Sequence, residues 1–243
     1  MLQSVKDIIR RIRIALLHLH CNKLSDVSVA TGTAFIIAPH PDDEVMGCGG
    51  LIQRLVKQGC NVHVVLMTGG EGSHQDCCDT SKSQIKDARR SLCTDIDRQL
   101  GVDNSHIHSL DYADGGILAA HNETERLQAL ISKLKPNTIF VPHWGEGWPD
   151  HVNTRSIIRS IASHDATIYE YCVWLWYYNV WRLDWNNARV LSMSEEEHKM
   201  KCLCVDGYVT PLAPCGKPWS GVLPRVLLDA LRWRKELFFV SVE

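Results

Sequence analysis

The chain has 243 residues, of which 45% are hydrophobic and 22% charged, and these values fit one α/β domain that buries its own core. Its 26 basic and 28 acidic side chains leave a formal charge of -2, so no overall positive field points to nucleic acid. The ten cysteines contain no C-x-x-C pair, which argues against a zinc ribbon and favours reduced, buried thiols in a cytoplasmic protein.

Residues 1–30 are expected to form an amphipathic helix and its exit, with no signal peptide or transmembrane segment. Basic residues interrupt the apolar run, and no stretch of the chain approaches the ~18 uninterrupted apolar residues that span a bilayer. We expect the apolar stripe of this helix to pack on the domain. Peripheral contact with a membrane, at its inner surface, is the alternative. The stripe consists of Val5, Ile8, Ile9, Ile12 and Leu16.

Residues 31–243 are expected to form the domain itself, and they begin with a strand, a helix and a strand. Residues 33–38, TAFIIA, are a short apolar run typical of a buried strand. Helical spacing follows in residues 51–58, after three glycines that we attribute to close packing of helix on strand. A second apolar strand follows at 62–68, and a βαβ unit of this length implies a parallel sheet.

The same alternation continues along the chain, and the aromatic-rich residues 167–178 are interpreted as strand. Ser194 and Glu197 form a capping box that starts a further helix. The sequence therefore predicts a single-domain, Rossmann-like α/β fold with a mostly parallel sheet and helices on both faces. The other expected elements are helices at 84–100, 123–134 and 151–161 and strands at 106–110 and 138–142.

A dense cluster of ionisable groups follows the first strand, in residues 39–44, PHPDDE. It holds one imidazole and three carboxylates, a concentration of negative charge that a divalent cation would stabilise. A second cluster, HWGEGWPDH at 143–151, follows the strand at 138–142. Because both clusters come at the carboxyl ends of strands, they can meet at one sheet edge and form a metal site with an open position for water. The loop at 68–73 can line the same crevice.

The motif PHPDDEVMGCGG, with TGGEGS after the next strand, resembles the LmbE/PIG-L-type N-acetylglucosaminyl deacetylases over roughly residues 33–153. The resemblance implies zinc ligands at His40, Asp43 and His151, with Fe²⁺ as an alternative to Zn²⁺. It implies that Asp42 is the general base. The implied reaction is hydrolysis of the acetamide of an N-acetylated amino sugar, carried as an N-acetylglucosamine-type glycoside, a nucleotide sugar or a lipid-linked sugar.

Further residues receive roles on the same grounds. The resemblance suggests that Arg89 or Arg90 and Asp114 face the substrate, and that Asp150 orients a metal ligand or a group behind one. Glu71, in the loop at 68–73, is expected to face the substrate from the wall of the crevice.

The chain departs from the family pattern at two positions. Where the family has HPDH this chain has WPDH, so Trp148 replaces the histidine that stabilises the oxyanion and helps to protonate the leaving amine. His143 is the nearest candidate to fill that gap. Leu92 stands where many relatives carry glutamate. Two alternatives follow: a zinc-dependent hydrolase of a non-sugar amide, and a weakly catalytic protein that binds metal or sugar.

Overall fold

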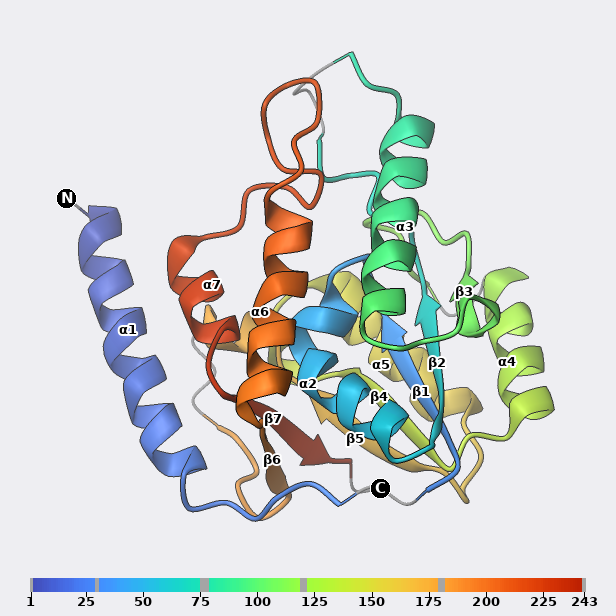
Figure 1. Cartoon of the computed structure of the whole chain (residues 1–243), viewed down its shortest axis with the longest axis horizontal. Helices are drawn as coiled ribbons and strands as arrows, with labels where there is room; N and C mark the ends of the chain where they lie inside the picture. Colours follow the sequence, from blue (N-terminus) through green and yellow to red (C-terminus); the bar gives the residue numbers. More distant parts are fainter. Residues whose placement is uncertain (1, 29–30, 75–78, 119–121, 179–181, 242–243) are drawn as a thin grey trace.

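A computed structural model describes residues 2–28, 31–74, 79–118, 122–178 and 182–241. Within these residues the centre is a seven-stranded sheet in the order β3-β2-β1-β4-β5-β7-β6 (Figure 1). Strands β1 to β5 run parallel, and β7 is antiparallel to both of its neighbours. The predicted mostly parallel α/β sheet is confirmed. The strands are β1 (Thr33–Ala38), β2 (Asn61–Leu66), β3 (Ile107–Ser109), β4 (Thr138–Pro142), β5 (Thr167–Tyr171), β6 (Ala188–Ser192) and β7 (Lys235–Val240).

Helices cover both faces of the sheet. Buried side chains of α4 and α5 form one core with Ile37 of β1, and those of α2, α3, α6 and α7 form the other core with Ile36. Because neighbouring residues of β1 point into opposite cores, this strand is apolar throughout instead of alternating. The helices are α1 (Leu2–Cys21), α2 (Asp43–Lys57), α3 (Lys82–Gln99), α4 (Asn122–Leu134), α5 (Pro149–Ile161), α6 (Glu195–Val209) and α7 (Arg225–Leu231).

The order of the strands determines where a ligand can bind. The chain passes from β1 to β2 on one side, whereas β4 lies on the other side of β1. The carboxyl ends of β1 and β4 therefore open a crevice at the point where the strand order reverses. Helix α2 starts directly after β1, and the short 3-10 helix η2 (Trp144–Glu146) and α5 follow β4. Both predicted clusters lie at this crevice.

Helix α2 begins at Asp43, eight residues before the predicted start, so its glycines lie inside the helix. A Cβ at Gly47 would come 2.2 Å from Cδ2 of Tyr171, and one at Gly50 would come 2.4 Å from Sδ of Met193. The packing role predicted for the glycines is confirmed. The predicted boundary is wrong because close packing against β5 outweighs the cost of glycine in a helix, which is about 1 kcal/mol per residue.

The aromatic segment is only partly a strand. Strand β5 ends at Tyr171, and residues 174–176 form the 3-10 helix η3. The buried carboxylate of Glu146 accepts hydrogen bonds from the backbone amides of Val173, Trp174 and Leu175 at 2.5–3.1 Å. Because these amides are bonded to a side chain, they cannot continue the strand ladder. The C-terminal elements β6, α7 and β7 were not predicted.

Helix α1 lies beside α7 (Figure 1), but its apolar stripe does not face the domain. Arg13 donates to the carbonyl oxygens of Leu175 and Trp176 at 2.8 and 2.5 Å, and the ring of His18 stacks on Trp233 at 3.7 Å. The predicted orientation is wrong because the opposite face docks the helix, with these polar and ring contacts and with Ile14 and Cys21 buried in the core. No helix among the described residues is long and apolar enough to cross a membrane. The predicted stripe is exposed by 51–61% at Val5, Ile8, Ile9, Ile12 and Leu16.

Candidate active site

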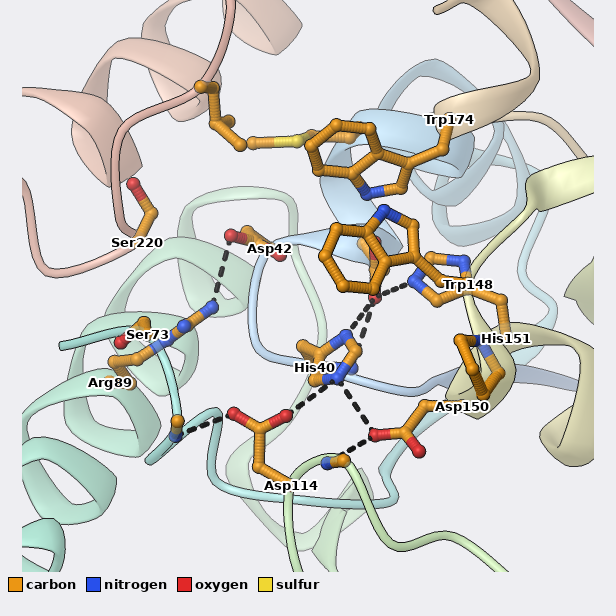
Figure 2. Close-up of a pocket in the computed structure, with 16 residues that line it drawn as sticks. His40, Asp42, Ser73, Arg89, Asp114, Trp148, Asp150, His151, Trp174 and Ser220 are labelled. Carbon is orange, nitrogen blue, oxygen red and sulfur yellow. Dashed lines mark hydrogen bonds and ion pairs between the residues drawn. The ribbon is translucent and has the colours of Figure 1, made fainter. Parts of the chain in front are cut away.

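A cavity of about 330 Å³ opens where the carboxyl ends of β1 and β4 meet. One side of it is polar and includes His40, Asp114 and Asp150, whereas Trp148 and Trp174 lie on the other side of His40 (Figure 2). Met46 and Leu223 also line the cavity. Most of the segments that surround it follow β1, β2, β3, β4 and β5, and Ser220 and Leu223 line it from the segment between α6 and α7.

Three of the predicted metal ligands meet in this cavity. His40, Asp43 and His151 each offer one ligand atom, and these atoms lie within 4.8 Å of one another. Oδ2 of Asp43 is 3.2 Å from both Nδ1 of His40 and Nε2 of His151. His151 is fully buried, and its Nε2 makes no hydrogen bond within the described residues. A buried nitrogen without a hydrogen bond is costly, so the set fits a divalent ion held by two imidazoles and a carboxylate.

A second set of ligand-type groups shares His40 with the first. Nε2 of His40 lies 3.1 Å from Asp114 and 3.2 Å from Asp150. Both carboxylates already accept backbone hydrogen bonds, Asp114 from Gly72 at 2.7 Å and Asp150 from Gly115 at 2.8 Å. These two carboxylates therefore orient the imidazole and leave Nδ1 directed at Asp43, an arrangement common behind metal-bound histidines.

The electrostatic field of the cavity favours positive charge. Burial by itself lowers the pKa of His151, but Asp43 and Glu146 outweigh it and raise that pKa to about 9. Burial also lowers the pKa of His40, but three neighbouring carboxylates raise it by more, so that this pKa lies well above its ordinary value. Burial raises the pKa of Asp43, but the two histidines lower it by more. The pKa of Asp43 therefore lies below its ordinary range. The negative field that favours protonation of the two histidines would also favour the binding of a divalent cation between them.

Asp42 lies beside the triad and has an unusual backbone. Its φ is 125°, a region that side chains rarely adopt, and its side chain is only 6% exposed. Arg89 donates to the Asp42 carboxylate at 3.1 Å and to the carbonyl of Pro41 at 2.7 Å, which fixes this conformation. Burial raises the pKa of Asp42 to about 8 although Arg89 opposes it. A carboxyl with that pKa can take and return a proton near neutral pH.

Two predicted substrate residues point elsewhere. Arg90 follows Arg89 on α3 and therefore points about 100° around the helix, since one turn takes 3.6 residues. Its guanidinium donates to the carbonyl of Leu110 and pairs with Asp111 at 3.1 Å. Glu71 accepts from the backbone amides of Gly69 at 3.2 Å and Asp114 at 3.0 Å. Neither side chain is among the described residues that line the cavity.

His143 lies in the core and not in the cavity lining, so the structure does not bring it to the gap left by Trp148. Its Nδ1 accepts from the amide of Gly145 at 3.0 Å, and its ring lies 4.5 Å from that of Phe239. Burial lowers its pKa to about 3, which keeps the ring neutral. These contacts are those of an N-capping side chain at η2.

Sequence reasoning missed several groups at the site. Glu146 lies 3.4 Å from Nδ1 of His151 and fixes that ring, and its place between two glycines in the second cluster was a usable signal. Leu223 comes from a segment far along the chain where no motif marked it, and Trp174 belongs to the aromatic run that the sequence assigned to a strand. Ser220 also lines the cavity, whereas Ser73 lies in the loop at 68–73 that the sequence predicted at this crevice.

Residues 35–162 match the family model described as PIG-L: GlcNAc-PI de-N-acetylase. The chain belongs to this family. The PIG-L match thus confirms the resemblance inferred from the motifs. Among curated relatives, the chain is 30% identical over 122 residues to the diacetylchitobiose deacetylase of Thermococcus kodakarensis. The aligned region covers 47% of this chain and 43% of that protein.

A second relative, a probable N-acetyl-alpha-D-glucosaminyl L-malate deacetylase of Bacillus cereus, is 27% identical over 140 residues, or 52% of this chain and 60% of that protein. The chain thus spans about half the length of these relatives.

Solved structures show the fold. The N,N'-diacetylchitobiose deacetylase of Pyrococcus horikoshii has a TM-score of 0.56 at 20% identity, over 72% of this chain and 68% of that one. The 4-carboxy-2-hydroxymuconate hydratase of Pseudomonas putida has a TM-score of 0.66 at 15% identity, over 88% of this chain and 97% of that one. Since the same fold carries a hydratase, function must be argued from the cavity and not from the fold.

Proposed function

We propose that this PIG-L family protein is a metal-dependent hydrolase, with Zn²⁺ or Fe²⁺, that removes the acetyl group from an N-acetylated amino sugar. The observation that carries the proposal is the placement of His40, Asp43 and His151 around one point beside the buried carboxyl of Asp42. Family membership and the names of the two relatives, both deacetylases, support the same reaction.

The residues divide the reaction as follows. His40, Asp43 and His151 would hold the divalent cation, which would lower the pKa of a water molecule and polarise the acetamide carbonyl. Asp42 accepts the proton of the attacking water as the new C–O bond forms, and it returns that proton to the nitrogen as the C–N bond breaks, so acetate and a free amine leave. Arg89 holds the carboxylate of Asp42 in place, and Asp114 and Asp150 hold the ring of His40. With His143 outside the cavity lining, Asp42 carries the proton in both directions.

The aromatic side of the cavity, formed by Trp148 and Trp174 and called here the apolar wall, supports a sugar substrate. Trp148 is 43% exposed and meets Trp174 edge to face, with ring centroids 5.5 Å apart. Aromatic faces pack well against the C–H faces of sugar rings, so Trp148 would replace a proton donor with a stacking surface. The same wall suits a non-sugar amide with an apolar substituent, which is the second candidate substrate.

The cysteines support a reducing compartment such as the cytoplasm. Six of those in the described residues are buried thiols outside any disulfide: Cys21, Cys48, Cys60, Cys93, Cys172 and Cys204. Burial raises the pKa of several of these thiols, Cys21 to about 12, which makes them unreactive packing groups.

The first test measures acetate released from a panel of N-acetylated sugars and simple N-acetyl amines, with and without a chelator. We expect release from sugars that stops on chelation and returns with added Zn²⁺ or Fe²⁺. Asp42→Asn should keep the metal and lose about 10²–10⁴-fold in kcat, as expected for the loss of a general base. His151→Ala should lose the metal itself. Turnover that survives chelation, or an Asp42→Asn variant at the wild-type rate, would contradict the proposal.

A further inference from the structure

Helix α1 presents an uninterrupted apolar surface to solvent. We call it the outer stripe. Exposed apolar residues are ordinary when scattered, but a contiguous row of them marks a surface that meets a partner or a membrane. The outer stripe consists of Val5, Ile8, Ile9, Ile12, Leu16 and Leu19, each exposed by 51–64%.

The outer stripe cannot turn inward, because the opposite face of α1 is already occupied. Ile14 and Cys21 are buried in the core, and Arg13 and His18 make the contacts with η3 and Trp233 described above. Arg10 adds a stacking contact, with its guanidinium carbon 3.8 Å from the ring centroid of Tyr177. The helix is therefore fixed at the edge of the molecule (Figure 1), with its apolar side outward.

The charges around the outer stripe distinguish between its candidate partners. Residues 2–23 carry five basic side chains and one acidic one, Asp7, which pairs with Arg10 at 2.8 Å. Lys6 and Arg11 are exposed beside the stripe, and no exposed residue between 5 and 20 is acidic. Arg11 pairs with Asp229 of α7 at 2.8 Å, and basic side chains still outnumber acidic ones along the helix. A second copy of this face would therefore bring like charges together, whereas an anionic lipid surface would complement them.

We propose that the outer stripe of α1 lies in the interface of a membrane rich in anionic lipid, with the helix axis parallel to the surface. A helix with one apolar side and a basic border partitions into the headgroup region through apolar burial and attraction to anionic lipids. Arg13 ties this helix to η3, whose Trp174 lines the cavity, so the membrane contact would also orient the cavity. The inference does not depend on the proposed chemistry.

The test measures binding of the full chain to phosphatidylcholine vesicles with and without phosphatidylglycerol, by flotation. We expect binding to the anionic vesicles that weakens in high salt. The double variant Ile12→Glu with Leu16→Glu removes the centre of the stripe and adds two negative charges, so its vesicle affinity should fall by at least about tenfold. Leu203→Glu is the matched control, because Leu203 is 53% exposed on α6 and should leave binding unchanged.

Circular dichroism and thermal unfolding of the variants check that all three proteins are folded. The proposal is overturned if the wild type does not bind anionic vesicles, or if the double variant binds as well as the wild type. It is also overturned if sedimentation shows that the wild type is a dimer and the double variant a monomer, while neither protein binds vesicles. The stripe would then contact a second copy of the chain. None of these outcomes bears on acetate release, so the proposed function is tested separately.

Discussion

Asp42 combines a strained backbone with a buried carboxyl, and it is the residue on which both chemistry and stability turn. A non-glycine residue held at a positive φ outside the common regions costs of order 1–3 kcal/mol. Arg89 supplies the compensation, because one guanidinium bonds both the carboxylate of Asp42 and the carbonyl of Pro41. The position therefore keeps a residue that its backbone disfavours, which is typical of functional sites.

Comparing Asp42→Gly with Asp42→Ala isolates that strain. Both variants remove the carboxylate that pairs with Arg89, but only glycine adopts a φ of 125° without strain. We expect Asp42→Gly to be more stable than Asp42→Ala by about 1 kcal/mol in chemical unfolding, with both inactive. An Asp42→Ala variant as stable as Asp42→Gly would show that the backbone at this position is relaxed.

Trp148 is the residue through which the apolar wall should act on substrate. Trp148→Ala should raise the KM for an N-acetylated sugar by roughly tenfold, as the loss of one stacking contact implies, with a smaller change in kcat. Trp144→Ala is the matched control, because Trp144 is 46% exposed in the same loop and does not line the cavity. If the two substitutions raised KM equally, Trp148 would not contact the substrate as proposed.

At the scale of elements, one buried ion pair connects α2, α6 and β7. Nζ of Lys201 lies 2.7 Å from Glu236, and the Glu236 carboxylate accepts from the amides of Gly50 and Leu51 at 2.7 and 2.9 Å. Both charged side chains are at most 3% exposed. Since α2 begins with Asp43, this pair holds the middle of the helix whose first residue is a proposed metal ligand.

Breaking the pair on one side should be expensive. Lys201→Met leaves the Glu236 carboxylate buried without a counter-charge, and we expect a loss of about 3–5 kcal/mol in the free energy of unfolding. Lys201→Met combined with Glu236→Gln should recover part of that loss, because no net charge then remains buried. Urea unfolding of the three variants measures both values. A double variant that is less stable than Lys201→Met alone would refute this explanation.

At the scale of the whole molecule, the proposed metal links two loops that are far apart in the sequence. His40 and Asp43 follow β1, and His151 lies on α5 after β4, so an ion held by all three exists only in the folded chain. A ligand that binds only the folded state raises its stability by mass action. The metal should therefore act as a crosslink across the crevice.

Added metal should raise the stability of the wild type accordingly. At a free metal concentration about 100 times Kd, the gain is about 2.7 kcal/mol, and His151→Ala should show almost none of it. Thermal unfolding of metal-free protein titrated with Zn²⁺ or Fe²⁺ measures the shift in Tm. A wild type whose Tm is indifferent to both metals would indicate that the triad holds no ion.

The sequence by itself determined the fold class and the family, because these depend on local patterns, and the family resemblance pointed to the three residues that the fold brings together, His40, Asp43 and His151. Apolar runs such as residues 33–38 define strands, and PHPDDE concentrates ionisable groups that a divalent cation would stabilise. Tertiary structure decided the rest. Arg89 and Arg90 are equivalent in sequence, but the helix turns one toward Asp42 and the other away. His143 is buried against Phe239 of β7, and α1 docks by the face opposite its outer stripe, because such choices depend on which surfaces remain free once distant segments have packed.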